Sequence, residues 1–153
     1  MSGEGGGQEL VVVGVDGSAE SIAALRWAAR YATATGARVR ALLAWHYPGA
    51  AGGPPIEKAP AAIHEQTDAQ MHETLDTAIA KAYEGQEAAG VEKSTAYGHP
   101  AQALIEASKE ADLLVVKHRG HGTFTGMLVG SVSIHCVTGA FCPVVVVRHG
   151  DGG

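Results

Sequence analysis

Short, continuous apolar runs recur along this chain, and they constrain its fold more than any other feature. Four of them, Leu10–Val15, Val39–Trp45, Leu113–Val116 and Pro143–Val147, consist almost entirely of apolar residues, valine above all. Such runs are typical of strands that are buried on both faces of a parallel sheet. A fifth segment, Val91–Tyr97, is more polar, and it predicts a strand that is less deeply buried.

The segments between these runs have the apolar spacing of helices. We expect helices over Ser18–Thr35, Ala61–Ala89 and Ser131–Thr138, and a further one that begins at Pro100. Glycines 36, 90 and 139 stand where three of these helices would end. Strands that alternate with helices at short spacing predict an α/β fold, with a five-stranded parallel sheet and helices on both faces.

Length and composition bound the class of protein. The 153 residues suit a single domain, which we place at residues 9–149 between flexible tails at 1–8 and 150–153. The net charge of −5 disfavours a broad nucleic-acid surface, and no apolar run reaches the length of a membrane span. Because the first residues also lack the pattern of a signal peptide, we expect a cytoplasmic protein. Cys136 and Cys142 are predicted to be reduced core residues.

Two segments that follow predicted strands are candidates for a binding site. Asp16 comes directly after the first strand, and Lys117–Ser133 is a basic, glycine-rich loop between the fourth strand and the last helix. The carboxyl ends of parallel strands meet at one edge of a sheet, where ligands bind. Backbone N–H groups of such a loop and a helix N-terminus attract anions, so the pair predicts a nucleotide-type ligand. In the simpler interpretation Asp16 shapes a turn or caps a helix, and the loop is only a long connection.

Motifs of the best-known nucleotide enzymes and hydrolases are missing. The chain has no P-loop, no dinucleotide-binding glycine fingerprint and no G-x-S-x-G nucleophile elbow. A catalytic triad built on Ser18, Ser131 or Ser133 stays open, since the sequence alone does not exclude one. We therefore favour a binding protein over an efficient enzyme. Trp45, at the end of a strand, is either a core residue or a wall for a flat ring, and we favour the core.

The two ends of the chain together resemble a known family. The landmarks are Val11 to Ser18 at the start, Gly98-His99-Pro100 in the middle, Arg119 to Ser133 near the end, and the following Cys142 to Val147. In this pattern, from Leu10 to about Arg148, the chain is similar to a single-domain universal stress protein. The ATP-binding branch of that family carries G-x-x-G-x₉-G-[ST]. Here Gly120 and Gly130-Ser131 match the motif, whereas Lys117 replaces its first glycine.

The resemblance implies a Rossmann-like fold of the adenine nucleotide alpha hydrolase-like type, and a site for ATP. Asp16 and the residues beside it would contact the adenosine, and Asp16 is also the candidate for holding Mg²⁺ through the nucleotide. The implied binding residues are Gly14, Val15, Asp16, Trp45, Val116, Lys117, Arg119, Gly120, Gly130, Ser131, Val132 and Ser133. Lys117 either crowds this pocket or directs its ammonium toward the phosphates. Of the two, we favour weakened binding.

The predicted function is that of a cytoplasmic stress-response regulator that binds ATP and signals to unknown protein partners through a homodimer. An apolar edge strand invites pairing with a second copy, and Pro143 suits an edge, so we expect the dimer at Pro143–Val147. Two alternatives stay open. One is a nucleotide-free stress protein that acts by dimerisation, because Lys117 disrupts the pocket. The other is a slow ATP hydrolase. A cyclic or diphosphate nucleotide is open as the ligand.

Overall fold

The computed structural model describes residues 8–45, 61–84, 90–118 and 131–148. Within these ranges strands and helices alternate, as the sequence predicts. The elements are β1 (Leu10–Gly14), α1 (Ala19–Thr35), β2 (Arg38–Trp45), α2 (Ala61–Ala82), β3 (Val91–Tyr97), α3 (Pro100–Ala107), β4 (Leu113–Lys117), α4 (Ser131–Gly139) and β5 (Val144–Val147). None of these helices is both long and apolar enough to cross a membrane.

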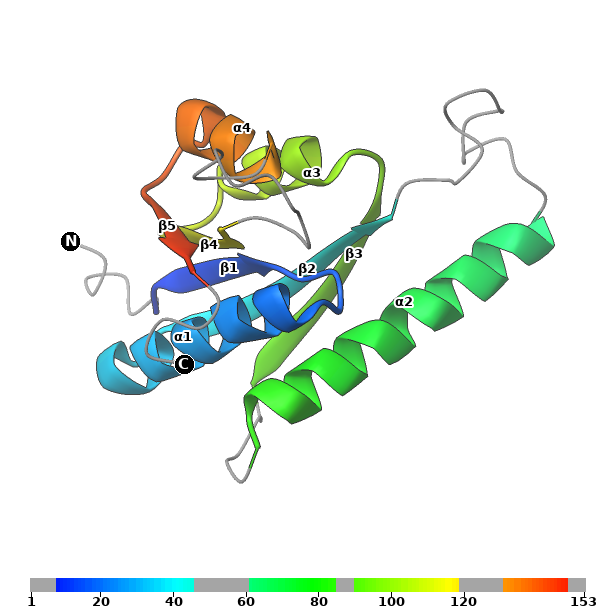
Figure 1. Cartoon of the computed structure of the whole chain (residues 1–153), viewed down its shortest axis with the longest axis horizontal. Helices are drawn as coiled ribbons and strands as arrows, with labels where there is room; N and C mark the ends of the chain where they lie inside the picture. The colour runs from blue at the N-terminus through cyan, green and yellow to red at the C-terminus, as the bar shows by residue number, and fades with distance from the viewer. Residues whose placement is uncertain (1–7, 46–60, 85–89, 119–130, 149–153) are drawn as a thin grey trace.

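The five strands form one parallel sheet in the order β3-β2-β1-β4-β5 (Figure 1). The central strand β1 lies between β2 and β4, with Val12 in register with Arg40 on one side and Leu114 on the other. The predicted five-stranded parallel sheet is thus confirmed. The two edges are β3 and β5, and their residues are mostly half-buried, in contrast to β1, whose residues are all buried except Gly14.

Helices cover both faces of the sheet, α1 and α2 on one side and α3 and α4 on the other (Figure 1). Alternate residues of β1 therefore enter different cores. Val11 and Val13 pack with Leu25 of α1 and Leu75 of α2. Val12 packs with the second core, on the α3 and α4 side, together with Cys136. This two-sided burial is why the strand sequences are continuously apolar rather than alternating.

Several predicted boundaries differ from the structure, most of them by one residue. Helix α2 ends at Ala82, not Ala89, and residues 85–89 lie outside the described ranges. Strand β1 ends at Gly14, one residue before the predicted Val15. Gly139, predicted to stop the last helix, is its final residue. A β-carbon at Gly139 would lie only 3.0 Å from the Ile105 side chain, so a glycine there permits the close approach of α3 and α4.

The cap of α1 and the cysteines agree with the sequence predictions. Gly36 ends α1 in the left-handed conformation, with φ of 80°, and its N–H donates to the carbonyl oxygen of Ala32 at 2.7 Å. Pro100 begins α3. Both cysteines are free thiols, with Cys136 fully buried and Cys142 half-buried in the same core.

Candidate functional site

Two neighbouring strands of the sheet, β1 and β4, send the chain to opposite faces, and we call the position between their carboxyl ends the crevice. Strand β1 leads into α1 on one face, and its neighbour β4 is followed by α4 on the other. In open α/β sheets ligands bind outside the carboxyl ends of the strands at such a switch of direction. Asp16 follows β1 and Lys117 ends β4, so both predicted residues lie at this point.

Asp16 shapes the turn between β1 and α1. Its Oδ1 accepts hydrogen bonds from the backbone N–H of Ser18 at 2.9 Å and from the Ser18 hydroxyl at 2.6 Å. Ser18 in turn caps α1, since its Oγ accepts from the N–H of Ser21 at 3.1 Å. Gly17 has a φ of 85°, which favours glycine at the centre of the turn. The structural role considered for Asp16 is therefore present.

The other oxygen of the same carboxylate is bound from a distant part of the chain. The Lys117 ammonium donates to Asp16 Oδ2, and it also lies 3.4 Å from Ser18 Oγ. The Lys117 side chain is 21% exposed and that of Asp16 is 48% exposed, so the ion pair is accessible from solvent. Burial alone would raise the pKa of Asp16, but hydrogen bonds from Lys117 and Ser18 and the charge of Lys117 outweigh it and lower the pKa to about 2. Asp16 is thus firmly ionised.

Ser133 links the start of α4 to the end of β4. It is only 2% exposed, and its hydroxyl donates to the carbonyl oxygen of Lys117 and to that of His118 at 3.1 Å. The side chain is therefore directed at the backbone at the end of β4. Any contact of Ser133 with a ligand would have to involve its main chain or a rearranged hydroxyl. Val132 packs against the second core.

The remaining predicted residues lie at the ends of β1, β2 and β4, at the start of α4, or outside the described ranges. Val15 and Val116 are buried, and Gly14 permits the close approach of Leu104, whose side chain would lie 3.0 Å from a β-carbon at Gly14. Trp45 ends β2, where its backbone is in register with Tyr97 of β3. Ser131 is the first residue of α4. Arg119, Gly120 and Gly130 lie outside the described residues.

Tyr97 and Asp68 add a polar contact at the carboxyl end of the sheet that the sequence analysis missed. The Tyr97 hydroxyl donates to Asp68 Oδ1 of α2 at 2.5 Å. This hydrogen bond, with burial and the negative charge of Asp68, raises the pKa of Tyr97 to about 12. Tyr97 is the last residue of a predicted strand, and this position could have indicated that it lies at the carboxyl end of the sheet. Its hydrogen bond with Asp68 of α2 could not be predicted from the sequence.

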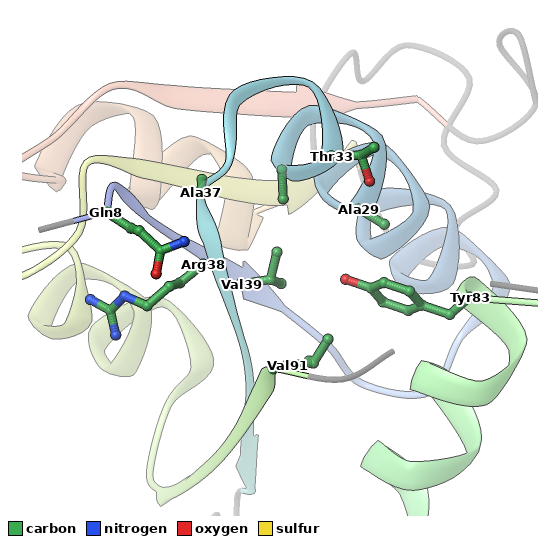
Figure 2. A pocket seen from close by; sticks show the side chains of 10 residues that line it. Gln8, Ala29, Thr33, Ala37, Arg38, Val39, Tyr83 and Val91 are labelled. Atoms are coloured by element: carbon green, nitrogen blue, oxygen red, sulfur yellow. The ribbon is translucent and has the colours of Figure 1, made fainter. Parts of the chain in front are cut away.

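A cavity of about 260 Å³ lies at the opposite, amino end of the sheet (Figure 2). Residues at the starts of β2 and β3 and near the ends of α1 and α2 line it, among them Ala29, Arg38, Val39, Tyr83 and Val91. Figure 2 shows the Tyr83 ring extending into the cavity, and burial raises the pKa of its phenol. None of the predicted binding residues contributes to this cavity.

The described residues include no group of three or more histidine, cysteine, aspartate or glutamate side chains that could hold a metal ion. Within these ranges, Asp16 alone represents the predicted Mg²⁺ position, and its second oxygen already contacts an ammonium. A nucleotide, in contrast, fits the chemistry of the crevice, because a partly exposed ammonium can bind a phosphate oxygen.

Comparison with known proteins agrees with this fold. The model of the universal stress protein family matches residues 9–148, nearly the whole chain. The chain therefore belongs to the universal stress protein family.

Relatives in that family are longer. A universal stress protein of Mycolicibacterium smegmatis is 35% identical over 143 residues, which cover 92% of this chain and 48% of the relative. One from Mycobacterium tuberculosis is 34% identical over 142 residues, which cover 93% of this chain and 46% of the relative. The chain thus spans about half the length of the curated relatives it matches.

Solved structures of similar length share the fold. A universal stress protein crystallised in complex with cAMP is 30% identical, with a TM-score of 0.63 and coverage of 94% of this chain and 98% of the other. The universal stress protein UspA from Lactobacillus plantarum is 24% identical, with a TM-score of 0.71 and coverage of 93% and 99%. The second likeness concerns the fold alone.

Proposed function

We propose that this protein binds an adenine nucleotide in the crevice between the carboxyl ends of β1 and β4, and that it acts as a cytoplasmic stress-response regulator. The observation that carries the proposal is the meeting of Asp16 and Lys117, which are 101 residues apart, at the point where the connections diverge. A 30% identical universal stress protein forms a complex with cAMP, which supports an adenine nucleotide as the ligand. ATP is the nucleotide that the glycine motif implies.

Charge and topology assign different tasks to the residues of the crevice. Asp16 would accept hydrogen bonds from the nucleoside, and the Lys117 ammonium would contact phosphate oxygens. By the family resemblance, Arg119, Gly120, Gly130 and the N-terminus of α4 would surround the phosphates. The bound nucleotide would supply the signal, by altering the surface that protein partners contact.

The proposal is tested by calorimetric titration of ATP with Mg²⁺, of cAMP and of GTP into the purified chain, beside Asp16→Ala. We expect an adenine nucleotide to bind and GTP to bind more weakly, and Asp16→Ala to reduce the affinity by about tenfold or more, as expected for the loss of a hydrogen bond to a charged group. Glu92→Ala, at the amino end of the sheet, is the control and should bind as the wild type does. Failure of every nucleotide to bind would favour the nucleotide-free alternative.

We further propose that the protein forms a homodimer through β5. This edge strand carries four consecutive, half-buried valines, and an unpaired apolar edge favours pairing with another chain. Three exposed apolar residues, Ile134, Val137 and Phe141, lie on α4 and just after it, and Phe141 is 65% exposed. They add apolar surface on the chain segment that leads into β5.

Light scattering coupled to gel filtration tests the dimer. Val145→Lys places a charge in the middle of the edge strand and should yield monomers. Thr95→Lys, on the opposite edge strand β3, is the matched control and should leave the oligomeric state unchanged. Circular dichroism of both variants verifies that they fold. A wild-type monomer, or equal effects of the two variants, would contradict an interface at β5.

A further inference from the structure

Both oxygens of the Asp16 carboxylate are bound by donors of the chain itself. Oδ1 accepts from the N–H and the hydroxyl of Ser18, at 2.9 and 2.6 Å, and Oδ2 accepts from the Lys117 ammonium. A divalent cation at this carboxylate would have to displace the ammonium or lie beside it, and two positive charges at that separation repel. The described part of the crevice therefore already contains a cation, namely the ammonium of Lys117.

The charge of that lysine changes what the crevice attracts. A lone Asp16 carboxylate would repel the phosphate of an approaching nucleotide, and the chain as a whole carries a net charge of −5. Lys117 neutralises Asp16 locally. Because its side chain is 21% exposed, the ammonium keeps donor capacity toward solvent. An ammonium has three N–H donors, so it can hold Asp16 and a phosphate oxygen together.

We propose that Lys117 is the built-in cation of this site, so that the nucleotide phosphate is bound by its ammonium without a divalent metal ion. The inference rests on the proposed function and narrows its ligand class. One ammonium that already pairs with Asp16 can offset little further negative charge. It therefore suits the singly charged phosphodiester of a cyclic adenine nucleotide best, and an open monophosphate, with up to about two charges, less well. A triphosphate carries several more charges and ordinarily binds with a metal ion that bridges its phosphates.

The test is a calorimetric titration of cAMP, AMP and ATP into the full chain, once in EDTA and once in Mg²⁺. The wild type should bind a monophosphate with affinities that agree within about twofold in the two buffers, because no metal takes part. Lys117→Met should weaken this binding in EDTA by about tenfold or more, since a charge-assisted hydrogen bond is lost. Lys117→Arg, which keeps the charge, should restore most of it.

A matched control separates the loss of this lysine from the loss of any lysine. Lys93 of β3 also pairs with an aspartate, Asp76 of α2, at 2.7 Å, and it lies outside the crevice. Lys93→Met should leave nucleotide affinity unchanged in both buffers.

A second readout needs no nucleotide. Mg²⁺ titrated alone should show no saturable binding to the wild type, and Lys117→Met should gain a weak site at the freed carboxylate.

The outcomes distinguish this inference from the function on which it rests. If nucleotides bind the wild type only with Mg²⁺, the proposed function stands and Lys117 is not the cation of the site. If Lys117→Met binds more tightly than the wild type in EDTA, Lys117 obstructs the pocket and the inference is wrong. If no nucleotide binds the wild type or any variant, the proposed function itself fails. Thermal unfolding of each variant shows that the comparison is made between folded proteins.

Discussion

Charged side chains at the two ends of the sheet are used in different ways. At the amino end they bind groups on neighbouring strands of the sheet. Asp112 accepts the N–H of Leu10 at 2.8 Å and so ties the start of β4 to that of β1. Glu92 of β3 binds Arg38 and Arg40 of β2 at 2.8 and 3.0 Å, so that the charges on the strand surfaces are mutually paired.

At the carboxyl end, the Asp16–Lys117 pair joins two segments that leave the sheet for opposite faces. Its partners come from the ends of β1 and β4, and both remain accessible to solvent. The Arg38–Glu92 pair at the amino end is about as exposed as the Asp16–Lys117 pair, so the position in the topology, not access to solvent, distinguishes them. The amino-end contacts should mainly stabilise the fold, and the carboxyl-end pair should mainly affect binding.

The largest effect is expected from Ser133→Val at the carboxyl end. The change removes the hydroxyl that binds two backbone carbonyl oxygens and adds volume at a buried position. We expect the free energy of unfolding to fall by about 2–4 kcal/mol, measured by urea denaturation. Thr138→Val is the control, because this exposed hydroxyl also donates to a carbonyl of α4. Unchanged stability with lost nucleotide binding would instead assign Ser133 to the ligand.

The next effect concerns the amino end. Asp112→Ala removes the acceptor of the Leu10 N–H and should lower the free energy of unfolding by about 1–2 kcal/mol, while nucleotide affinity stays the same. Glu110→Ala, two residues earlier, removes a carboxylate whose side chain is 71% exposed and that pairs with Arg40 at 3.3 Å, and should cost less than about 0.5 kcal/mol. A change in nucleotide affinity with Asp112→Ala would contradict the expectation that amino-end contacts affect stability and not binding.

A pH dependence is expected from Tyr97. Its pKa is raised in the folded protein to about 12 from the ordinary tyrosine value of 10.0, so the unfolded chain loses this proton first as the pH rises. The contribution of Tyr97 to stability is therefore complete below pH 10 and is lost between about pH 10 and 12. Denaturation curves across this range should fall less steeply for Tyr97→Phe. Identical slopes for the two proteins would show that the hydrogen bond to Asp68 does not stabilise the neutral phenol.

Among the changes at the carboxyl end, the smallest effect on stability is expected from Lys117→Met. An ion pair as exposed as Asp16–Lys117 contributes little, so the free energy of unfolding should change by less than about 1 kcal/mol. The same variant is expected to lose nucleotide affinity. A loss of affinity with little loss of stability would distinguish the carboxyl-end pair most clearly from the contacts at the amino end. A loss of stability as large as that of Ser133→Val would mean that the pair is a structural contact like those at the amino end.

The order of strands and helices and the parallel sheet were predictable from the sequence, because each depends on local periodicity and on burial of the strands from both faces. The continuous valines of β1 predicted that this strand is buried on both faces of the sheet. The rule that parallel strands end at one edge also predicted that Asp16 and Lys117 would lie at the same edge, and their contact confirms it.

The direction of individual side chains was decided only by the tertiary structure. The sequence left open whether Lys117 crowds the pocket or extends toward the phosphates, and the structure shows it bound to Asp16, a residue 101 positions away. Ser133 was assigned to the ligand by resemblance, yet its hydroxyl donates to the backbone at the end of β4. Such choices depend on which donors and acceptors packing brings within about 3 Å of each other, and local sequence patterns do not encode that distance.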